Sequence, residues 1–297
     1  MTDQLVAQAA AEVFRRHCSP EVVRRAEHDG WAPALWHELE ASGLTAAGTA
    51  LPLAEAAEVV RVAAGYAAPV PIAETVLAGL LRGADVPDGP LTVVHRGRAS
   101  YGRVAAALLS GDGFVPRAEA ALEPAANLAG EPLDLAGVPD AAGADVARLG
   151  ALLRAVQLVG ALERVLELTA TYVEERRQFG VPLVRFQAVQ QQLATLAGEV
   201  ATAATAVEHA VEFPGEIEVA AAKIRSGEAA AAGAAIAHQL HGAIGMTDEH
   251  ELGLYTRRLW SWRDDFGGEA EWARRLGAAV LREPGLLWGH APARGTD

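Results

Sequence analysis

Two stretches of the chain carry residues whose types and spacing suit ligand binding. In the first, residues 172–191, the run Y-V-E-E-R-R-Q-F-G-V-P-L-V-R-F-Q-A-V-Q-Q ends one helical pattern and begins another. Arg176 offers a rigid fork for phosphate oxygens, and an aromatic ring such as that of Phe179 can stack on a flat base. Gln187 and Gln190 add amides at the restart of the helix. The set fits a dinucleotide site or a plain helix–loop–helix corner with a solvated arginine, and chemistry alone favours the corner.

The second stretch, residues 238–258, reads H-Q-L-H-G-A-I-G-M-T-D-E-H-E-L-G-L-Y-T-R-R. Gln239, Gly242 and Gly245 close one predicted helix, and Thr247 is the expected N-cap of the next. Glycines allow another backbone or a ligand to come close. The same G-x-x-G spacing also serves as a simple helix C-cap, so this stretch alone indicates no particular ligand.

Several common chemistries have no motif in the sequence. There is no GxxxxGK[ST] phosphate loop, no GxGxxG after a strand, no HExxH and no Glu-x-x-His of a di-iron bundle. His238 and His241 lie one helical turn apart, but no further ligands accompany them. We interpret both as ordinary polar positions and expect no metal.

Composition sets the broad class. The chain has 297 residues, 51% of them hydrophobic and 5% aromatic, and its abundant alanine favours helix. A net charge of -13 repels phosphate backbones, so we expect no nucleic-acid partner. Cys18 is the only cysteine, which excludes an internal disulfide. We see no signal peptide, and the alanine-rich run 229–237 is too short to cross a bilayer, so we expect a cytoplasmic protein without membrane contact.

Hydrophobic periodicity divides the chain into three expected segments. Residues 1–82 read as short helices, 83–144 as a small β-type or irregular segment with a strand at 91–95, and 145–297 as long helices. Long helices joined by short turns predict a bundle. After the first bundle helix, the later ones are expected at about 184–213, 215–240, 248–262 and 268–281.

Together, in this order and spacing, the two stretches resemble the acyl-CoA dehydrogenase family over most of the chain. The second resembles its Q-x-x-G-G-x-G motif, with Ala243 in place of the second glycine. The first resembles its R-x-Q-F-G-x-P-L-x-x-F-Q motif, which is matched by Arg176, Gln178, Phe179, Gly180, Pro182, Leu183, Phe186 and Gln187. The resemblance implies a mainly α fold with an N-terminal helical domain, a central β domain and a C-terminal four-helix bundle.

The resemblance also implies a cofactor and its ligands. Family members bind FAD and remove hydrogens from the α and β carbons of an acyl-CoA. Their two motifs hold the ADP part of a FAD seated in the neighbouring subunit. Carried over, Arg176 contacts the pyrophosphate, Phe179 the adenine side and Gln239 the ADP. The full set of expected FAD-binding residues is Arg176, Gln178, Phe179, Gln187, Gln239 and Gly242.

The chain departs from the family where a subunit faces its own flavin. The central segment is short, and no tryptophan occurs between Trp36 and Trp260 to face the isoalloxazine. The family's catalytic glutamate positions fall at Phe266 and near Gly150. Asp265 is therefore the candidate base in this chain. The nearby acids Glu269 and Glu271 are interpreted as surface helix residues.

These departures lead to the hypothesis of a short subunit in an α2β2 heteromer. A larger acyl-CoA dehydrogenase-like subunit would carry the base, while this chain would clamp the ADP end of its FAD. Similar unequal pairs act in bacterial steroid side-chain degradation, so a bulky acyl-CoA substrate and an electron-transfer flavoprotein as acceptor are expected. The alternatives are a self-sufficient homodimer that uses Asp265, and a non-catalytic helical scaffold.

Overall fold

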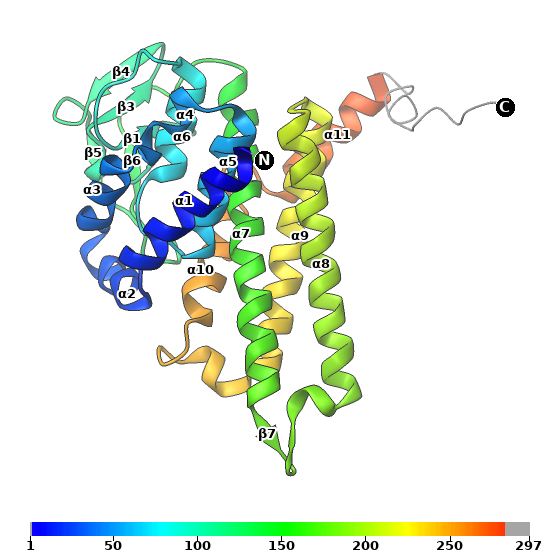
Figure 1. The fold of residues 1–297 in the computed structure, drawn as a ribbon. Coiled ribbons are helices and arrows are strands. Elements are labelled where there is room, and N and C mark those ends of the chain that lie inside the picture. The colour runs from blue at the N-terminus through cyan, green and yellow to red at the C-terminus, as the bar shows by residue number, and fades with distance from the viewer. Residues whose placement is uncertain (1, 283–297) are drawn as a thin grey trace.

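The computed structural model describes residues 2–282, most of which are helical, as the mainly α class predicted (Figure 1). Residues 283–297 of the expected C-terminal segment lie outside the described residues. The division of the chain into domains at 82/83 and 144/145 stays a prediction. One helix ends at Arg82, the next begins at Asp145, and the described strands before Arg177 lie between them.

Short helices form the N-terminal part of the molecule. The second of them shows how the sequence sets its ends. Ser19 caps it by accepting from the Val22 backbone N–H, Pro20 occupies its first turn, and Gly30 ends it at a φ of 90°. The helical elements of this part are α1 (Thr2–His17), α2 (Pro20–Asp29), α3 (Pro33–Ala41), η1 (Leu44–Ala46), α4 (Ala47–Ala50), α5 (Leu53–Gly65) and α6 (Ile72–Arg82).

Two small sheets fill the central segment. In one, β1 is parallel to β3 and β3 is antiparallel to β4; in the other, β6 is antiparallel to both β2 and β5. A minor core of Val94, Ala99, Leu108 and Ala120 belongs to this segment alone. Its elements are β1 (Leu91–Val93), β2 (Arg98–Ser100), η2 (Gly102–Val104), β3 (Ala107–Ser110), β4 (Gly113–Pro116), β5 (Leu122–Glu123) and β6 (Leu133–Ala136).

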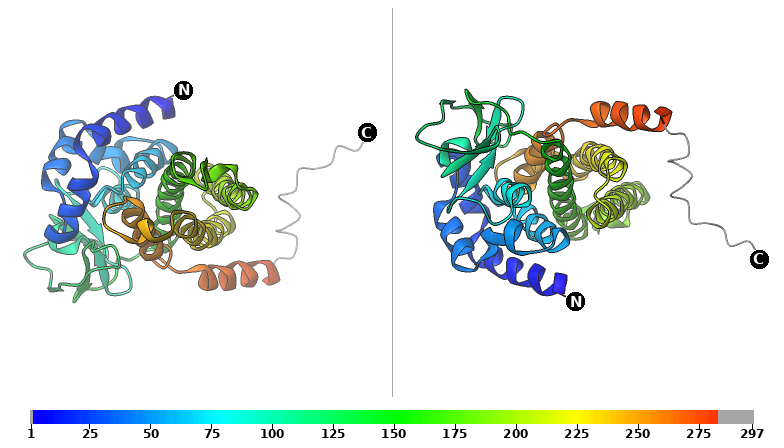
Figure 2. Two further views of the ribbon diagram at one scale, coloured as in Figure 1. Left: turned by 90° about the horizontal axis from the view of Figure 1, so that it is seen from below. Right: turned by 90° about the horizontal axis from the view of Figure 1, so that it is seen from above.

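Three long helices run side by side through the C-terminal part, and two shorter helices pack on them (Figures 1 and 2). The three are α7 (Asp145–Glu175), α8 (Gln187–Glu212) and α9 (Glu216–His241). The shorter α10 (Leu252–Trp262) packs on α7 and α9, and α11 (Glu269–Arg282) packs on α9. The start expected at residue 248 for α10 was wrong. Residues 242–246 form the short helix η4, and the Thr247 hydroxyl donates to the Ile244 carbonyl instead of capping α10.

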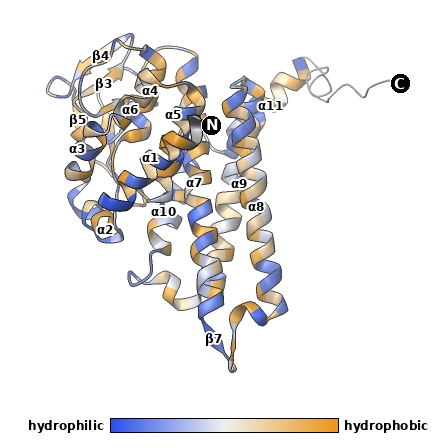
Figure 3. Cartoon of the chain, in the orientation of Figure 1, coloured by the Kyte–Doolittle hydropathy of each residue, from blue (hydrophilic) through white to orange (hydrophobic). Residues whose placement is uncertain are grey.

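One continuous core joins the N-terminal helices, the first sheet and the bundle. Helix α7 is buried along most of its N-terminal half because it packs on α5 and α6 as well as on α9. Hydrophilic residues interrupt the apolar ones along α7 and α8 (Figure 3). Within residues 2–282, no helix combines the length and the apolar character needed to cross a membrane.

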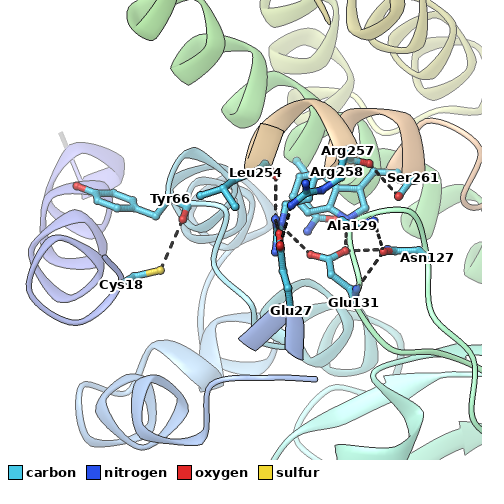
Figure 4. Close-up of polar contacts among 12 residues, drawn as sticks. Cys18, Glu27, Tyr66, Asn127, Ala129, Glu131, Leu254, Arg257, Arg258 and Ser261 are labelled. Atoms are coloured by element: carbon cyan, nitrogen blue, oxygen red, sulfur yellow. Dashed lines mark hydrogen bonds and ion pairs between the residues drawn. The ribbon is translucent and has the colours of Figure 1, made fainter. Parts of the chain in front are cut away.

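A buried cluster of charges ties these parts together (Figure 4). Arg258 of α10 is fully buried, and its guanidinium donates to Glu131 of the loop before β6 at 2.9 Å and to Glu27 of α2 at 3.2 Å. The Trp262 indole and the Asn127 amide also donate to Glu131. The cluster therefore fixes α2, the central segment and the bundle relative to one another.

Candidate functional site

A β-hairpin projects from the end of the bundle where α7 passes into α8 (Figure 1). Its strands, β7 (Arg177–Gln178) and β8 (Val181–Pro182), are joined by Phe179 and Gly180. Both turn residues have positive φ values, 50° and 83°. Positive φ at both central positions is the requirement of a type I′ hairpin turn, in which Asn-Gly is preferred and a phenylalanine is strained.

Phe179 is exposed over 93% of its surface at the tip of this hairpin. Its ring meets that of Phe186 edge-on, with the centroids 6.3 Å apart. An exposed aromatic side chain on a strained backbone contributes nothing to the core of its own chain. Such strain is typical of residues that contact a ligand or another chain.

Arg176 stands at the base of the hairpin with a free guanidinium. Its side chain forms no hydrogen bond or ion pair with any residue in the described range 2–282, although the chain has a surplus of acids. The buried arginines Arg154 and Arg258, in contrast, both pair with carboxylates. The fork of Arg176 is therefore available to an outside anion.

A groove with a volume of about 620 Å³ opens beside this arginine. It lies between the end of α7, the hairpin, the start of α8 and the end of α9, and it brings together Arg176, Gln178, Gln239 and Gly242. Of the expected residues, Phe179 and Gln187 do not line it. The full lining is Tyr172, Arg176, Gln178, Leu183, Ala188, Val189, Gln192, Gln239, Leu240, His241, Gly242, Ala243 and Ile244.

The groove contains residues that the sequence motifs did not single out. Tyr172 and His241 form part of its wall, and Gln192 adds an amide five residues after the start of α8 at Gln187. The His241 ring stacks on Tyr172 with the centroids 4.4 Å apart. Aromatic residues at helix ends are common in protein cores, so the residue types of Tyr172 and His241 did not point to a site. Their position next to the two motifs was the one feature of the sequence that could have indicated them.

The candidate base Asp265 lies in a second region, at the N-terminal end of α7. Its Oδ2 accepts a hydrogen bond of 3.0 Å from Nε of Arg154, which is only 4% exposed. Arg154 also donates to Glu74 at 2.7 Å and to Gln157. Burial raises the pKa of Glu74 despite the adjacent guanidinium. Asp265, whose side chain is 25% exposed, thus forms the partly exposed end of an ion cluster around Arg154.

Aromatic rings fill the space next to Asp265. Phe266, at a φ of 55°, stacks on His95 with the centroids 4.8 Å apart. A Cβ on Gly150 would overlap the Phe266 ring. The cavity that remains among Gly150, Arg154, Phe266 and their neighbours has a volume of about 20 Å³, roughly that of one water.

The other acids and histidines have local partners. Glu269 pairs with Arg263, and Glu271 pairs with Arg96 and Arg275. Their side chains are 22% and 21% exposed, so both are partly buried by these ion pairs in the first turn of α11.

The two histidines singled out by spacing make different contacts. Nε2 of His238 bonds to the Thr256 hydroxyl, whereas His241 faces Tyr172. In the described part of the chain, no group of three or more His, Cys, Asp or Glu side chains is placed to hold a metal ion.

Comparison with known proteins agrees with the fold and the motifs. The family model for the acyl-CoA dehydrogenase C-terminal domain matches residues 145–281. The chain is 31% identical to acyl-CoA dehydrogenase IpdE2 of Mycobacterium tuberculosis, over 95% of this chain and 98% of that protein. It is 30% identical to IpdE2 of Mycolicibacterium smegmatis, over 94% and 98%.

Solved structures extend the likeness to the whole fold. A chain of the ChsE4–ChsE5 complex from Mycobacterium tuberculosis superposes with a TM-score of 0.79 at 24% identity, covering 95% of this chain and 97% of that one. A chain of a Tcur3481–Tcur3483 steroid ACAD variant gives a TM-score of 0.83 at 22% identity, covering 95% and 98%.

The helical fold and the paired motifs define a class of oxidoreductases that act on acyl-CoA. The protein belongs to the acyl-CoA dehydrogenase family.

Proposed function

We propose that this chain is the smaller subunit of an FAD-dependent acyl-CoA dehydrogenase that introduces an α,β double bond into an acyl-CoA. In this proposal it contributes the ADP-binding half of the FAD site to a larger, acyl-CoA dehydrogenase-like partner, in an α2β2 assembly. The observation that carries the proposal is the unpaired Arg176 beside a groove of about 620 Å³, under an exposed Phe179. A groove of this volume is in the range of cofactor sites.

The residues at the groove fit the ADP part of FAD. The free fork of Arg176 suits the pyrophosphate, since a guanidinium binds two phosphate oxygens at once. Gln178 and Gln239 offer amide donors and acceptors, and the exposed backbone at Gly242 leaves room for a ligand to approach. Phe179 projects away from this chain, which suits contact with adenine at a subunit boundary. Bound FAD supplies the hydride acceptor for the reaction.

The distance between the two regions supports a site shared with a partner. Gly150 and Arg176 lie at opposite ends of α7, and at ~1.5 Å per residue they are about 39 Å apart. A dinucleotide held at the groove is too short to present its flavin ring beside Asp265 of the same chain. The flavin ring is therefore assigned to a second chain. Asp265 is paired with Arg154 and has only about 20 Å³ of free space beside it, which favours a larger partner carrying the base over a second copy of this chain.

The names of two structural neighbours support the proposed assembly and substrate. One structural neighbour is named as a complex of two proteins and another as a steroid ACAD. We extend both properties to this chain, and propose a bulky acyl-CoA such as a steroid side chain. An electron-transfer flavoprotein is the proposed electron acceptor.

The test is to co-produce this chain with a larger acyl-CoA dehydrogenase-like subunit and to follow bound flavin by its visible spectrum. We expect a yellow complex. Arg176→Ala should weaken FAD binding about 10- to 100-fold, because it removes a charge-assisted contact to phosphate.

Arg177→Ala is the matched control. Arg177 is the next residue along the chain, is also exposed and does not line the groove. Equal FAD retention by the two variants, or a colourless complex, would contradict the proposal. A yellow homodimer of the lone chain would favour the homodimer alternative instead.

A further inference from the structure

The C-terminal end of α9 carries Gln239, and Gly242 follows the helix as its C-cap; both residues line the groove. Its last residue, His241, is 3% exposed. The Gly242 N–H bonds to the His238 carbonyl, and Gly242 then turns the chain at a φ of 64°. This backbone cap closes the last turn of α9, and contacts from outside the helix hold it further, because helix ends otherwise fray readily.

Tyr172 of α7 supplies that contact. Its hydroxyl donates to the carbonyl oxygen of His241 at 3.2 Å, and its ring lies on the His241 imidazole with an interplanar angle of 20°. Tyr172 therefore holds both the backbone and the side chain of the last residue of α9. It is also four residues before Arg176, about one helical turn, so one end of α7 is tied to both parts of the groove.

The His241 imidazole is held just as firmly from its other sides. Its Nδ1 lies 2.8 Å from the carbonyl of Ala237 and must donate to it, which leaves Nε2 as a bare acceptor. That Nε2 is buried and has no partner among the described residues. The edge of the ring meets His250 with the centroids 4.5 Å apart. A Cβ on Gly245 would lie 2.8 Å from the Cβ of His241, so the last glycine of the motif is needed for this packing.

We propose that Tyr172 and His241 form a positioning pair that fixes the end of α9 and so aims Gln239 and Gly242 into the dinucleotide groove. This inference rests on the proposed function. The pair touches the groove wall, yet its main effect is on the placement of the residues beside it. Its loss should loosen FAD without removing any of the expected ligands.

The pair is most stable while the imidazole is neutral, because a proton added to the buried Nε2 would have no acceptor among the described residues. Burial lowers the pKa of His241; the bond to Ala237 opposes this effect, and repulsion from His250 and His238 adds to it. The other charged or titratable groups around the cluster are Tyr172 on α7, Glu251 beside His250, and Arg164, which pairs with Glu251.

A histidine in an unfolded segment has a pKa of about 6.5, whereas the pKa of His241 packed at the end of α9 is lower. As the pH falls, the state in which this helix end has opened therefore binds a proton first. The packed helix end is fully stable above about pH 7 and loses stability as the pH falls. Nδ1 of His250 accepts from the Leu252 backbone N–H, a bond that protonation would also remove.

The experiment measures FAD release from the co-purified complex by the rise in flavin fluorescence, at pH 7.5 and pH 5.5. At pH 7.5, Tyr172→Ala and His241→Ala should each release FAD about tenfold faster than the native complex, and Tyr172→Phe, which loses only the hydroxyl, about threefold faster. His241→Phe keeps a ring of similar shape but cannot be protonated. This variant should release FAD slowly at pH 7.5. Lowering the pH to 5.5 should speed its FAD release less than it speeds release from the native complex.

The control is His209→Ala at the other end of the bundle, where the His209 ring lies 5.1 Å from that of Phe213. It should leave FAD release unchanged at both pH values. If Tyr172→Ala and His241→Ala retain FAD like the native complex while Arg176→Ala releases it, the positioning role is wrong and the proposed function stands. If Arg176→Ala also retains FAD, the proposed function itself is wrong.

Discussion

At the scale of single residues, the two regions of interest differ in what their arginines do. Arg176 is exposed and unpaired at a groove, whereas Arg154 is buried and shared between Glu74 and Asp265. A free guanidinium can bind a ligand without first breaking an ion pair. A buried one cannot, since removing a partner costs about 3–5 kcal/mol.

The tight packing around Phe266 can be tested by replacing each of two glycines in the bundle helices with alanine. Alanine for glycine within a helix normally stabilises by about 0.5–1 kcal/mol. Gly198 on α8 has open space around it, so Gly198→Ala should show this gain. Gly150→Ala should instead lower the free energy of unfolding by about 1–3 kcal/mol, because the Phe266 ring is held by His95 and cannot move aside freely. Urea unfolding followed by circular dichroism measures both. A gain in both variants would mean that the space beside Gly150 is open.

At the scale of elements, the hairpin tip should show a conflict between stability and function. Phe179→Asn places a residue that tolerates positive φ in the turn, so the free energy of unfolding should rise by about 1 kcal/mol. The same change removes the exposed ring, so the complex should release FAD faster. Thermal unfolding and flavin fluorescence measure the two effects.

Phe213→Asn is the control for the hairpin. Phe213 is also exposed, at 52%, in the turn between α8 and α9, but its φ is -126°. Neither the strain relief nor the loss of FAD should follow there. If Phe179→Asn gains no stability, the turn is not strained; if it retains FAD fully, Phe179 has no part in binding.

The elements differ in how far the sequence could predict them. The bundle helices follow from apolar spacing, and the break at 213–215 from Pro214 and Gly215. The hairpin could not be predicted, because phenylalanine does not favour positive φ and two-residue strands carry no periodic pattern. The start of α10 was misplaced at residue 248, because η4 and the turn at residues 247–251 precede the helix, which begins at Leu252.

The candidate site was predictable only in part. Arg176, Gln239 and Gly242 were found through the order and spacing of two motifs. Tyr172 and His241 were missed as a pair because they lie 69 positions apart and meet only when α7 and α9 pack together. Asp265 was singled out by its position in the chain, but its partner Arg154 is 111 positions away and could not be seen.

At the scale of the whole molecule, the parts are held in place by the charge cluster of Figure 4. Arg257 and Arg258 are neighbours on α10, and both donate to Glu27. Arg258 is fully buried and also holds Glu131, whereas the side chain of Arg257 is 38% exposed.

Arg258→Met should lower the free energy of unfolding by about 3–5 kcal/mol, because it leaves Glu131 buried without its cation. Arg257→Met should cost about 0–1 kcal/mol, as for an exposed ion pair. Urea unfolding of the two variants makes the comparison, with the denaturant slope checking that unfolding stays cooperative. If both variants lose the same small amount, apolar packing alone fixes the N-terminal helices on the bundle. A large loss confined to Arg258→Met would mean that one buried guanidinium sets how the three parts meet.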